Sequence, residues 1–188
     1  WTNAEYPSNL FRLQLVQRLL AAAGAASVYE LGAGDATPLI TLAGDGLRVA
    51  GNDISAEMVK VARANMQAHG LDPLAIAHLD VQDEGAMAAE HERAGVFDAV
   101  MALGVIPHVA DDTAFVQAMD GFLSPGGRLV LQFRNSLFSM FTFNRLTKEF
   151  ILDDLLADVD PVIRDVVAAD LDARLAVDKP PVRTRPTG

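Results

Sequence analysis

The stretch Val28-Tyr29-Glu30-Leu31-Gly32-Ala33-Gly34-Asp35 decides the fold of this chain. A short apolar run that carries an acid, then two glycines one residue apart, then a helical pattern, predicts a strand, a tight turn and a helix. Glycine lets the backbone of such a turn approach a bound molecule closely. We therefore expect a binding site at the carboxyl end of this strand.

Composition places the chain among ordinary globular proteins. It has 188 residues, 51% of them hydrophobic and 21% charged, which predicts one domain with a sizeable core. No apolar run reaches the roughly 18 residues of a membrane span, and no secretion signal opens the sequence, so we predict a cytoplasmic protein. The absence of cysteine excludes disulfides and thiolate metal sites. A net charge of −10 disfavours nucleic acid as a partner.

Strand patterns alternate with helical patterns through most of the chain. The expected strands are 28–31, 47–51, 74–79, 96–103 and 128–133. Because no hairpin signal joins consecutive strands, the alternation predicts an α/β fold with a doubly wound, mostly parallel sheet. A further helix should precede the first strand and pack one face on the sheet, with apolar residues at helical spacing: Leu10, Phe11, Leu15, Val16, Leu19 and Leu20.

Two acids near the glycine turn indicate what binds there. Asp53 ends the second predicted strand, nineteen positions after Gly34, where a carboxylate can accept both ribose hydroxyls of an adenosine. Glu30 lies just before the glycines and can face an amino group. Pro38 lacks the N–H that a pyrophosphate needs at a helix start, which favours adenosine without pyrophosphate. A purely structural turn is the alternative reading.

Five segments, in order and spacing over about residues 25–135, resemble the class I S-adenosylmethionine-dependent methyltransferases. They are Glu30-Leu31-Gly32-Ala33-Gly34, Asn52-Asp53-Ile54-Ser55, Leu79-Asp80-Val81, Phe97-Asp98-Ala99-Val100 and Leu123-Ser124-Pro125-Gly126-Gly127-Arg128-Leu129. The resemblance implies a three-layer, Rossmann-like fold and an enzyme that uses S-adenosylmethionine. Members often carry a third glycine where this chain has Ala36, a departure that we expect to leave the turn intact.

The resemblance also assigns cofactor-binding roles by position. Gly32 and Gly34 would line the methionine moiety, and Glu30 would organise its amino end. Asp53 would bind the ribose, and Ile54 would pack on the adenine. Asp80 would accept a hydrogen bond from the exocyclic amine of the adenine, and the Val81 backbone would add a contact. Leu103 and Gly104 would line the pocket near the transferred methyl. A loop acid or helix cap is the alternative for Asp80.

Catalysis would demand little of the protein, because the sulfonium is already activated and the enzyme mainly aligns the acceptor and excludes water. Where the acceptor needs a base, His108 after the fourth strand is the candidate, with a structural histidine as the alternative. His69, His78 and His91 lack ligand-like spacing, so no metal site is predicted.

The acceptor is predicted only by class. The chain lacks both the Asn/Asp-Pro-Pro-Tyr/Phe element of amino-methyltransferases acting on DNA bases and glutamine, and the cysteine of cytosine-C5 enzymes. Together with the acidic charge, this leaves a small metabolite, a sugar or a protein side chain, and we predict a small-molecule acceptor. The alternatives are a non-catalytic cofactor-binding or scaffold member of the fold, and an NAD-type oxidoreductase.

The C-terminal part departs from the family pattern, which usually ends in two antiparallel strands. No strand pattern follows Arg134, so either the chain is truncated or helices replace those strands. We predict a single domain, 1–188, with an N-terminal arm and helix (1–24), a cofactor-binding core (25–135), a helical tail (136–178) and coil (179–188). The tail, alone or with a partner subunit of a homodimer, should cover the edge of the fifth strand.

Overall fold

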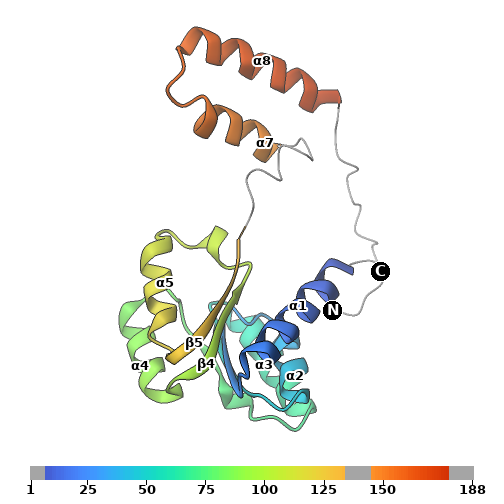
Figure 1. The fold of residues 1–188 in the computed structure, drawn as a ribbon, viewed down its shortest axis with the longest axis vertical. Coiled ribbons are helices and arrows are strands. Elements are labelled where there is room, and N and C mark those ends of the chain that lie inside the picture. The colour runs from blue at the N-terminus through green and yellow to red at the C-terminus, as the bar shows by residue number, and fades with distance from the viewer. Residues whose placement is uncertain (1–6, 134–144, 178–188) are drawn as a thin grey trace. The chain divides into compact units, whose positions relative to one another are not determined.

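The computed structural model describes residues 7–133 and 145–177. The chain divides into two compact units, Trp1–Phe133 and Arg134–Gly188. The first unit contains the whole sheet, shown in Figure 1. That both units form one methyltransferase domain stays a prediction.

The first unit is built on five parallel strands in the order β3-β2-β1-β4-β5. They are β1 (Ser27–Leu31), β2 (Arg48–Asp53), β3 (Ile76–His78), β4 (Phe97–Leu103) and β5 (Leu123–Gln132). The order reverses direction between β1 and β4, which is where open α/β sheets leave a crevice at their carboxyl ends. The predicted doubly wound sheet is confirmed.

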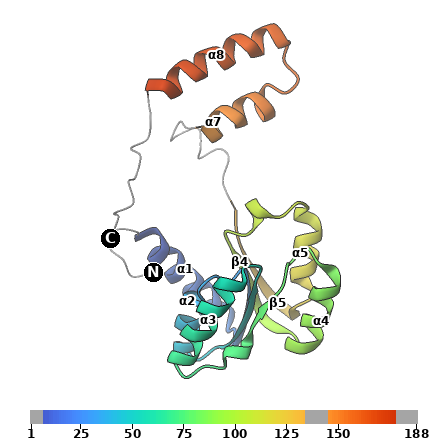
Figure 2. The same ribbon diagram turned by 180° about the vertical axis from the view of Figure 1, so that it is seen from behind.

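Helices cover both faces of this sheet, as Figures 1 and 2 show from opposite sides. One layer holds α1 (Pro7–Ala23), α2 (Thr37–Gly44) and α3 (Ala56–Ala68), and the other holds α4 (Glu84–Ala94) and α5 (Asp112–Asp120). Each layer has its own apolar core against the sheet. None of the described helices is long and apolar enough to cross a bilayer.

The buried face of α1 agrees with the predicted one at Val16 and Leu20 and differs from it elsewhere. Leu13, Val16 and Leu20 are buried, whereas Phe11, Leu15 and Leu19 lie 64%, 50% and 47% exposed. All six side chains recur at helical spacing, so periodicity alone could not choose between two overlapping apolar stripes. Packing of α1 against the sheet selects the stripe that contains Leu13.

Two strands also differ in length from the prediction. The third begins later, at Ile76, because Pro73–Ala75 forms a 3₁₀ turn capped by Asp72, whose carboxylate accepts the Leu74 N–H at 2.9 Å. The fifth begins earlier, at Leu123, which pairs with Phe97. The Ser-Pro-Gly-Gly segment 124–127 was expected to precede the strand but belongs to it, at a register shift between the Phe97–Leu123 and Ala99–Arg128 pairs.

The described part of the second unit is helical, as predicted for the tail. It contains α7 (Arg145–Glu149), a π-helical turn (Phe150–Leu155) and α8 (Pro161–Val177). Lys148 joins α7 to α8 through an ion pair with Asp172 at 2.6 Å. Residues 136–144 of the predicted tail, and the coil 179–188, lie outside the described residues, and coverage of the β5 edge stays a prediction.

A buried polar network crosses the α4 face of the sheet. The Tyr29 hydroxyl donates to Glu90 Oε1 at 2.9 Å and accepts from Asn52 Nδ2 at 2.9 Å. Arg93 grips the same carboxylate with two hydrogen bonds of 2.6 and 2.7 Å. Burial, followed by the Glu90 charge, raises the pKa of Tyr29. A phenol has one proton, so donating it to Glu90 fixes the Asn52 amide with its nitrogen toward Tyr29.

We expect Tyr29→Phe to lower the free energy of unfolding by about 1–3 kcal/mol, because a buried amide and a buried carboxylate each lose a partner. The measurement is urea unfolding of the full chain at pH 7. An unfolding free energy within about 0.5 kcal/mol of the wild type would show that the hydroxyl contributes nothing.

Candidate functional site

The glycine turn follows β1 and bends back over β2. Gly32 and Gly34 have φ values of 73° and 56°, and the Ala33 N–H donates to the Asn52 carbonyl at 2.8 Å. Ala36 is the one non-glycine residue with positive φ in the described ranges, at 61°. The family's third glycine is thus replaced by an alanine that keeps the left-handed conformation, and the turn is retained as predicted.

Asp53 holds the turn from the end of β2. Its Oδ2 accepts the Gly34 N–H at 2.8 Å, and its Oδ1 accepts the Ser55 N–H at 2.8 Å. The residue is only 9% exposed. A carboxylate offers about four acceptor positions, so each oxygen retains one for a further donor.

A pocket of about 250 Å³ opens beside this turn, at the carboxyl ends of the strands. Eight of the predicted site residues line it: Gly32, Asp53, Ile54, Asp80, Val81, Leu103, Gly104 and His108. The other lining residues are Asn52, Gln82, Val105 and Val109. Glu30 and Gly34 do not line it: Glu30 is buried, and the Gly34 N–H binds Asp53. We name this space the nucleoside pocket.

Glu30, which precedes the glycine turn, interacts electrostatically with Arg12 of α1, and we call these two residues the charged pair. Glu30 is 2% exposed, and its Oε2 has no hydrogen-bond partner among the described residues. Burial raises the pKa of Glu30 well above its usual value, and the Arg12 charge opposes this rise. Arg12 comes from α1, and its Nη1 donates to Gln132 Oε1 at 2.6 Å. The site therefore holds a buried acid with one unused acceptor, close to a cation.

Glu30 predicts a pH-dependent stability. Its pKa in the folded chain is raised, so its favourable contribution is complete below the unfolded-state pKa and is lost as pH rises through the folded one. We expect Glu30→Gln to remove this loss. The free energy of unfolding of the variant, relative to the wild type, should increase above about pH 4.5 by up to about 1.4 kcal/mol per pH unit.

Urea unfolding between pH 4 and 8 tests this expectation. The control is Glu92→Gln, which removes an exposed carboxylate from α4 and should show no such trend. A constant difference between Glu30→Gln and the wild type over the whole range would contradict the prediction.

Asp80 and His108 occupy two loops on the rim of the pocket. Asp80 Oδ1 accepts the Gln82 N–H at 2.9 Å, which forms a turn after β3. His108 ends the 3₁₀ turn Ile106–His108, and its N–H donates to the Val105 carbonyl at 2.8 Å. Its imidazole is exposed and makes no hydrogen bond within the described residues. No group of three or more metal-ligating side chains occurs in residues 7–133 or 145–177.

Polar residues from outside the strand–turn–helix motif also lie near the site, and the sequence did not predict them. Arg12 and Gln132 are separated by 120 positions, and only folding brings them together. One signal was available: Arg12 precedes the buried Val16 and Leu20 at intervals of four, so it lies on the sheet-facing side of α1. A positively charged residue in line with buried apolar residues is unusual, and it indicates that Arg12 has a polar partner near the sheet.

Comparison with known proteins agrees with the site. The model of a family described as "Methyltransferase domain" matches residues 29–129. A ubiquinone biosynthesis O-methyltransferase of Xanthomonas axonopodis pv. citri (strain 306) is 34% identical over 157 residues, which cover 80% of this chain and 63% of the relative. The chain thus spans about 63% of the length of the curated relatives it matches.

Solved structures extend the comparison. A sugar N-methyltransferase from Streptoalloteichus sp ATCC 53650 is 28% identical, with a TM-score of 0.50 over 63% of this chain and 46% of its own. An amino pentose methyltransferase from Micromonospora echinaspora, solved with S-adenosylmethionine bound, is 27% identical, with a TM-score of 0.51 over 64% of this chain and 48% of its own. With its strand order, its glycine turn and these relatives, the chain belongs to the class I S-adenosylmethionine-dependent methyltransferases.

Proposed function

We propose that this chain transfers the methyl group of S-adenosylmethionine to a small-molecule acceptor. The observation that carries the proposal is a set of buried acceptor groups at the switch point of the sheet, where Asp53 lines the nucleoside pocket and Glu30 precedes the glycine turn beside it. Asp53 retains acceptor positions, and Glu30 Oε2 is buried without a hydrogen-bond partner among the described residues. A ligand with ribose hydroxyls and an ammonium group supplies the donors that these atoms require.

The charged pair fits the amino-acid end of the cofactor. Glu30 would accept from the ammonium, and its charge would then have a partner that offsets its burial. Arg12, fixed by Gln132, would face the carboxylate. A zwitterion therefore matches two opposite charges that the fold itself places close together.

The other end of the pocket suits an adenosine. Asp53 would hold the ribose, and the exposed Ile54 would pack on the adenine face. Asp80 would accept from the exocyclic amine with its second oxygen, because its first already accepts the Gln82 N–H. The Val81 backbone would add a contact at the same edge.

When bound, S-adenosylmethionine supplies a methyl group already activated by the positively charged sulfur. The protein then has to orient the acceptor and exclude water. Leu103 and Gly104 line the pocket beside the turn and would face the reacting end. His108 would accept the acceptor's proton, for which its exposed imidazole is available.

The acceptor class is proposed from the relatives and from charge. The named relatives act in ubiquinone biosynthesis or on sugars, and a net charge of −10 disfavours nucleic acid. A compound with a hydroxyl group, as an O-methyltransferase uses, and an amino sugar are therefore the first acceptors to test. We also propose that the protein acts in the cytoplasm. A homodimer is proposed as its assembly, and sedimentation of the full chain measures it.

Calorimetric titration of the full chain with S-adenosylmethionine, S-adenosylhomocysteine and NAD tests the proposal, followed by an assay for S-adenosylhomocysteine release with both acceptors. We expect micromolar binding of the two sulfur ligands, about −8 kcal/mol, no binding of NAD, and turnover that falls in His108→Ala. Binding without turnover on any acceptor would favour the non-catalytic alternative. Binding of NAD alone would overturn the proposal.

A further inference from the structure

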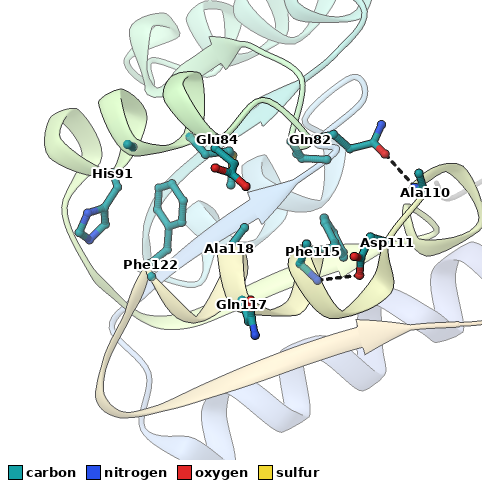
Figure 3. Close-up of a pocket in the computed structure, with 14 residues that line it drawn as sticks. Gln82, Glu84, His91, Ala110, Asp111, Phe115, Gln117, Ala118 and Phe122 are labelled. Atoms are coloured by element: carbon teal, nitrogen blue, oxygen red, sulfur yellow. Dashed lines mark hydrogen bonds between the residues drawn. The ribbon is translucent and has the colours of Figure 1, made fainter.

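The loops after β3 and β4 meet although their strands are not neighbours. β2 and β1 lie between them in the sheet, which separates the strand ends by about 14 Å. Nevertheless, the Ala110 N–H donates to Gln82 Oε1 at 2.8 Å, as Figure 3 shows. Within residues 7–133, no other hydrogen bond joins 79–83 to 104–111. One side chain therefore links the two loops.

These loops form two walls of the nucleoside pocket. The first contributes residues 80–82, and the second contributes Gly104, Val105, His108 and Val109. The first wall holds the residues proposed for the adenine edge, and the second holds the proposed base. The distance between the two walls determines how tightly a nucleoside fits.

Gln82 also lines a second space beside the nucleoside pocket. A groove of about 430 Å³ lies between α4 and α5, and Val81 and Gln82 line both it and the nucleoside pocket. Figure 3 shows this groove with Phe115 and Phe122 among its lining residues. Val81 and Gln82 are therefore the residues that the groove and the nucleoside pocket share.

The backbone of Gln82 adds a second link. Its N–H donates to Asp80 Oδ1 at 2.9 Å, while its side chain accepts from Ala110. One residue thus fixes both the carboxylate proposed for the adenine amine and the loop that carries His108.

We infer that Gln82 is a positioning residue that sets the width of the nucleoside pocket through its hydrogen bond with Ala110. The inference rests on the proposed function. Gln82 itself is exposed, so the bond contributes little to the stability of the whole fold. Loss of this hydrogen bond changes the spacing of the two loops and thereby lowers the affinity for the cofactor.

Two single variants remove the bond from opposite sides. Gln82→Met keeps the length of the side chain and removes the acceptor, and Ala110→Pro removes the donor. Val109 has φ −95° and ψ 150°, which is the conformation that the residue before a proline adopts. Gln82→Glu retains an acceptor oxygen and serves as the conservative variant. Gln117→Met is the control, because Gln117 lines the same groove and makes no side-chain hydrogen bond within the described residues.

The experiment measures the Kd for S-adenosylhomocysteine by calorimetry, the KM for S-adenosylmethionine and kcat, and the unfolding free energy in urea. We expect Kd and KM to rise about three- to tenfold in Gln82→Met and in Ala110→Pro. The double variant should be no weaker than the worse single variant, because both remove one bond. Gln82→Glu should bind more tightly than Gln82→Met, and kcat and the unfolding free energy should change little.

Three results would overturn the inference while leaving the proposed function intact. They are equal Kd values for Gln82→Met and Gln117→Met, additive losses in the double variant, and a loss of affinity that only follows a loss of folded protein. If the wild-type chain binds neither sulfur ligand, the proposed function itself fails, and the role of Gln82 fails with it.

Discussion

Replacing Asp53 with alanine is expected to raise the Kd for S-adenosylhomocysteine at least 100-fold. The carboxylate accepts the N–H groups of Gly34 and Ser55, and both would lose a charged partner. Hydrogen bonds to a charged group contribute about 1.5–3 kcal/mol each, and every 1.4 kcal/mol is a factor of ten in affinity. The ligand would also lose the acceptor for its ribose hydroxyls, so the variant would lose both the hydrogen bonds that hold the turn and the contact with the ribose.

Asparagine should rescue this position poorly. Its amide has one oxygen, so either the Gly34 or the Ser55 N–H would face an NH₂ group. We expect Asp53→Asn to bind at least tenfold more weakly than the wild type, although the two side chains have the same shape. Calorimetry at 25 °C measures both variants, and urea unfolding reports how much of each chain is folded.

Asp45→Ala is the control for these variants, because Asp45 follows α2 and its Oδ2 accepts from Gln17 at 2.7 Å, outside the pocket. Its Kd should stay within twofold of the wild type. An Asp53→Ala variant that binds as the wild type does would show that the second strand's acid is a turn residue only.

The second large effect is expected at Gly32, where alanine should lower the unfolding free energy by about 2–5 kcal/mol. Positive φ costs an alanine about 1–2 kcal/mol. The new Cβ would also overlap Val105 Cγ2, and such overpacking costs about 1–3 kcal/mol more. Since Val105 lines the nucleoside pocket, its displacement should also weaken cofactor binding.

Gly46→Ala separates the two causes. Gly46 has φ 94° and no atom within 4 Å of its added Cβ, so only the backbone term applies there. Combining Gly32→Ala with Val105→Ala should recover the steric part, so the double variant should be more stable than the two single losses imply. Urea unfolding measures the wild type, the single variants Gly32→Ala, Gly46→Ala and Val105→Ala, and the double variant. Equal losses for Gly32→Ala and Gly46→Ala would contradict the steric argument.

The parts of the fold that depend on short segments were predictable from the sequence. The doubly wound parallel sheet follows from the alternation of patterns, and Asp53, Asp80 and Leu103 meet because each lies at the carboxyl end of its strand or just beyond it. Parallel strands bring these ends to one edge of the sheet. Local patterns were sufficient because each residue lies within or next to the motif that places it.

Features that depend on packing between distant segments were not predictable. The burial of Leu13 rather than Phe11 depends on how α1 meets the sheet. The bonds from Arg12 to Gln132 and from Ala110 to Gln82 join residues far apart in sequence. β5 begins at Leu123 because that residue pairs with Phe97. The Ser-Pro-Gly-Gly segment that follows Leu123 has the sequence pattern of a turn, so the sequence predicted a later start.

The buried phenol of Tyr29 has a further consequence in alkali. Its raised pKa means that the ring stays protonated in the folded chain at a pH where a solvent-exposed tyrosine ionises. Stability is therefore lost as pH rises above about 10, since the unfolded chain releases a proton that the folded chain keeps. Phenolate absorbs at longer ultraviolet wavelengths than phenol. In a chain with two tyrosines, alkaline unfolding should thus be visible as an absorbance step that needs no added dye.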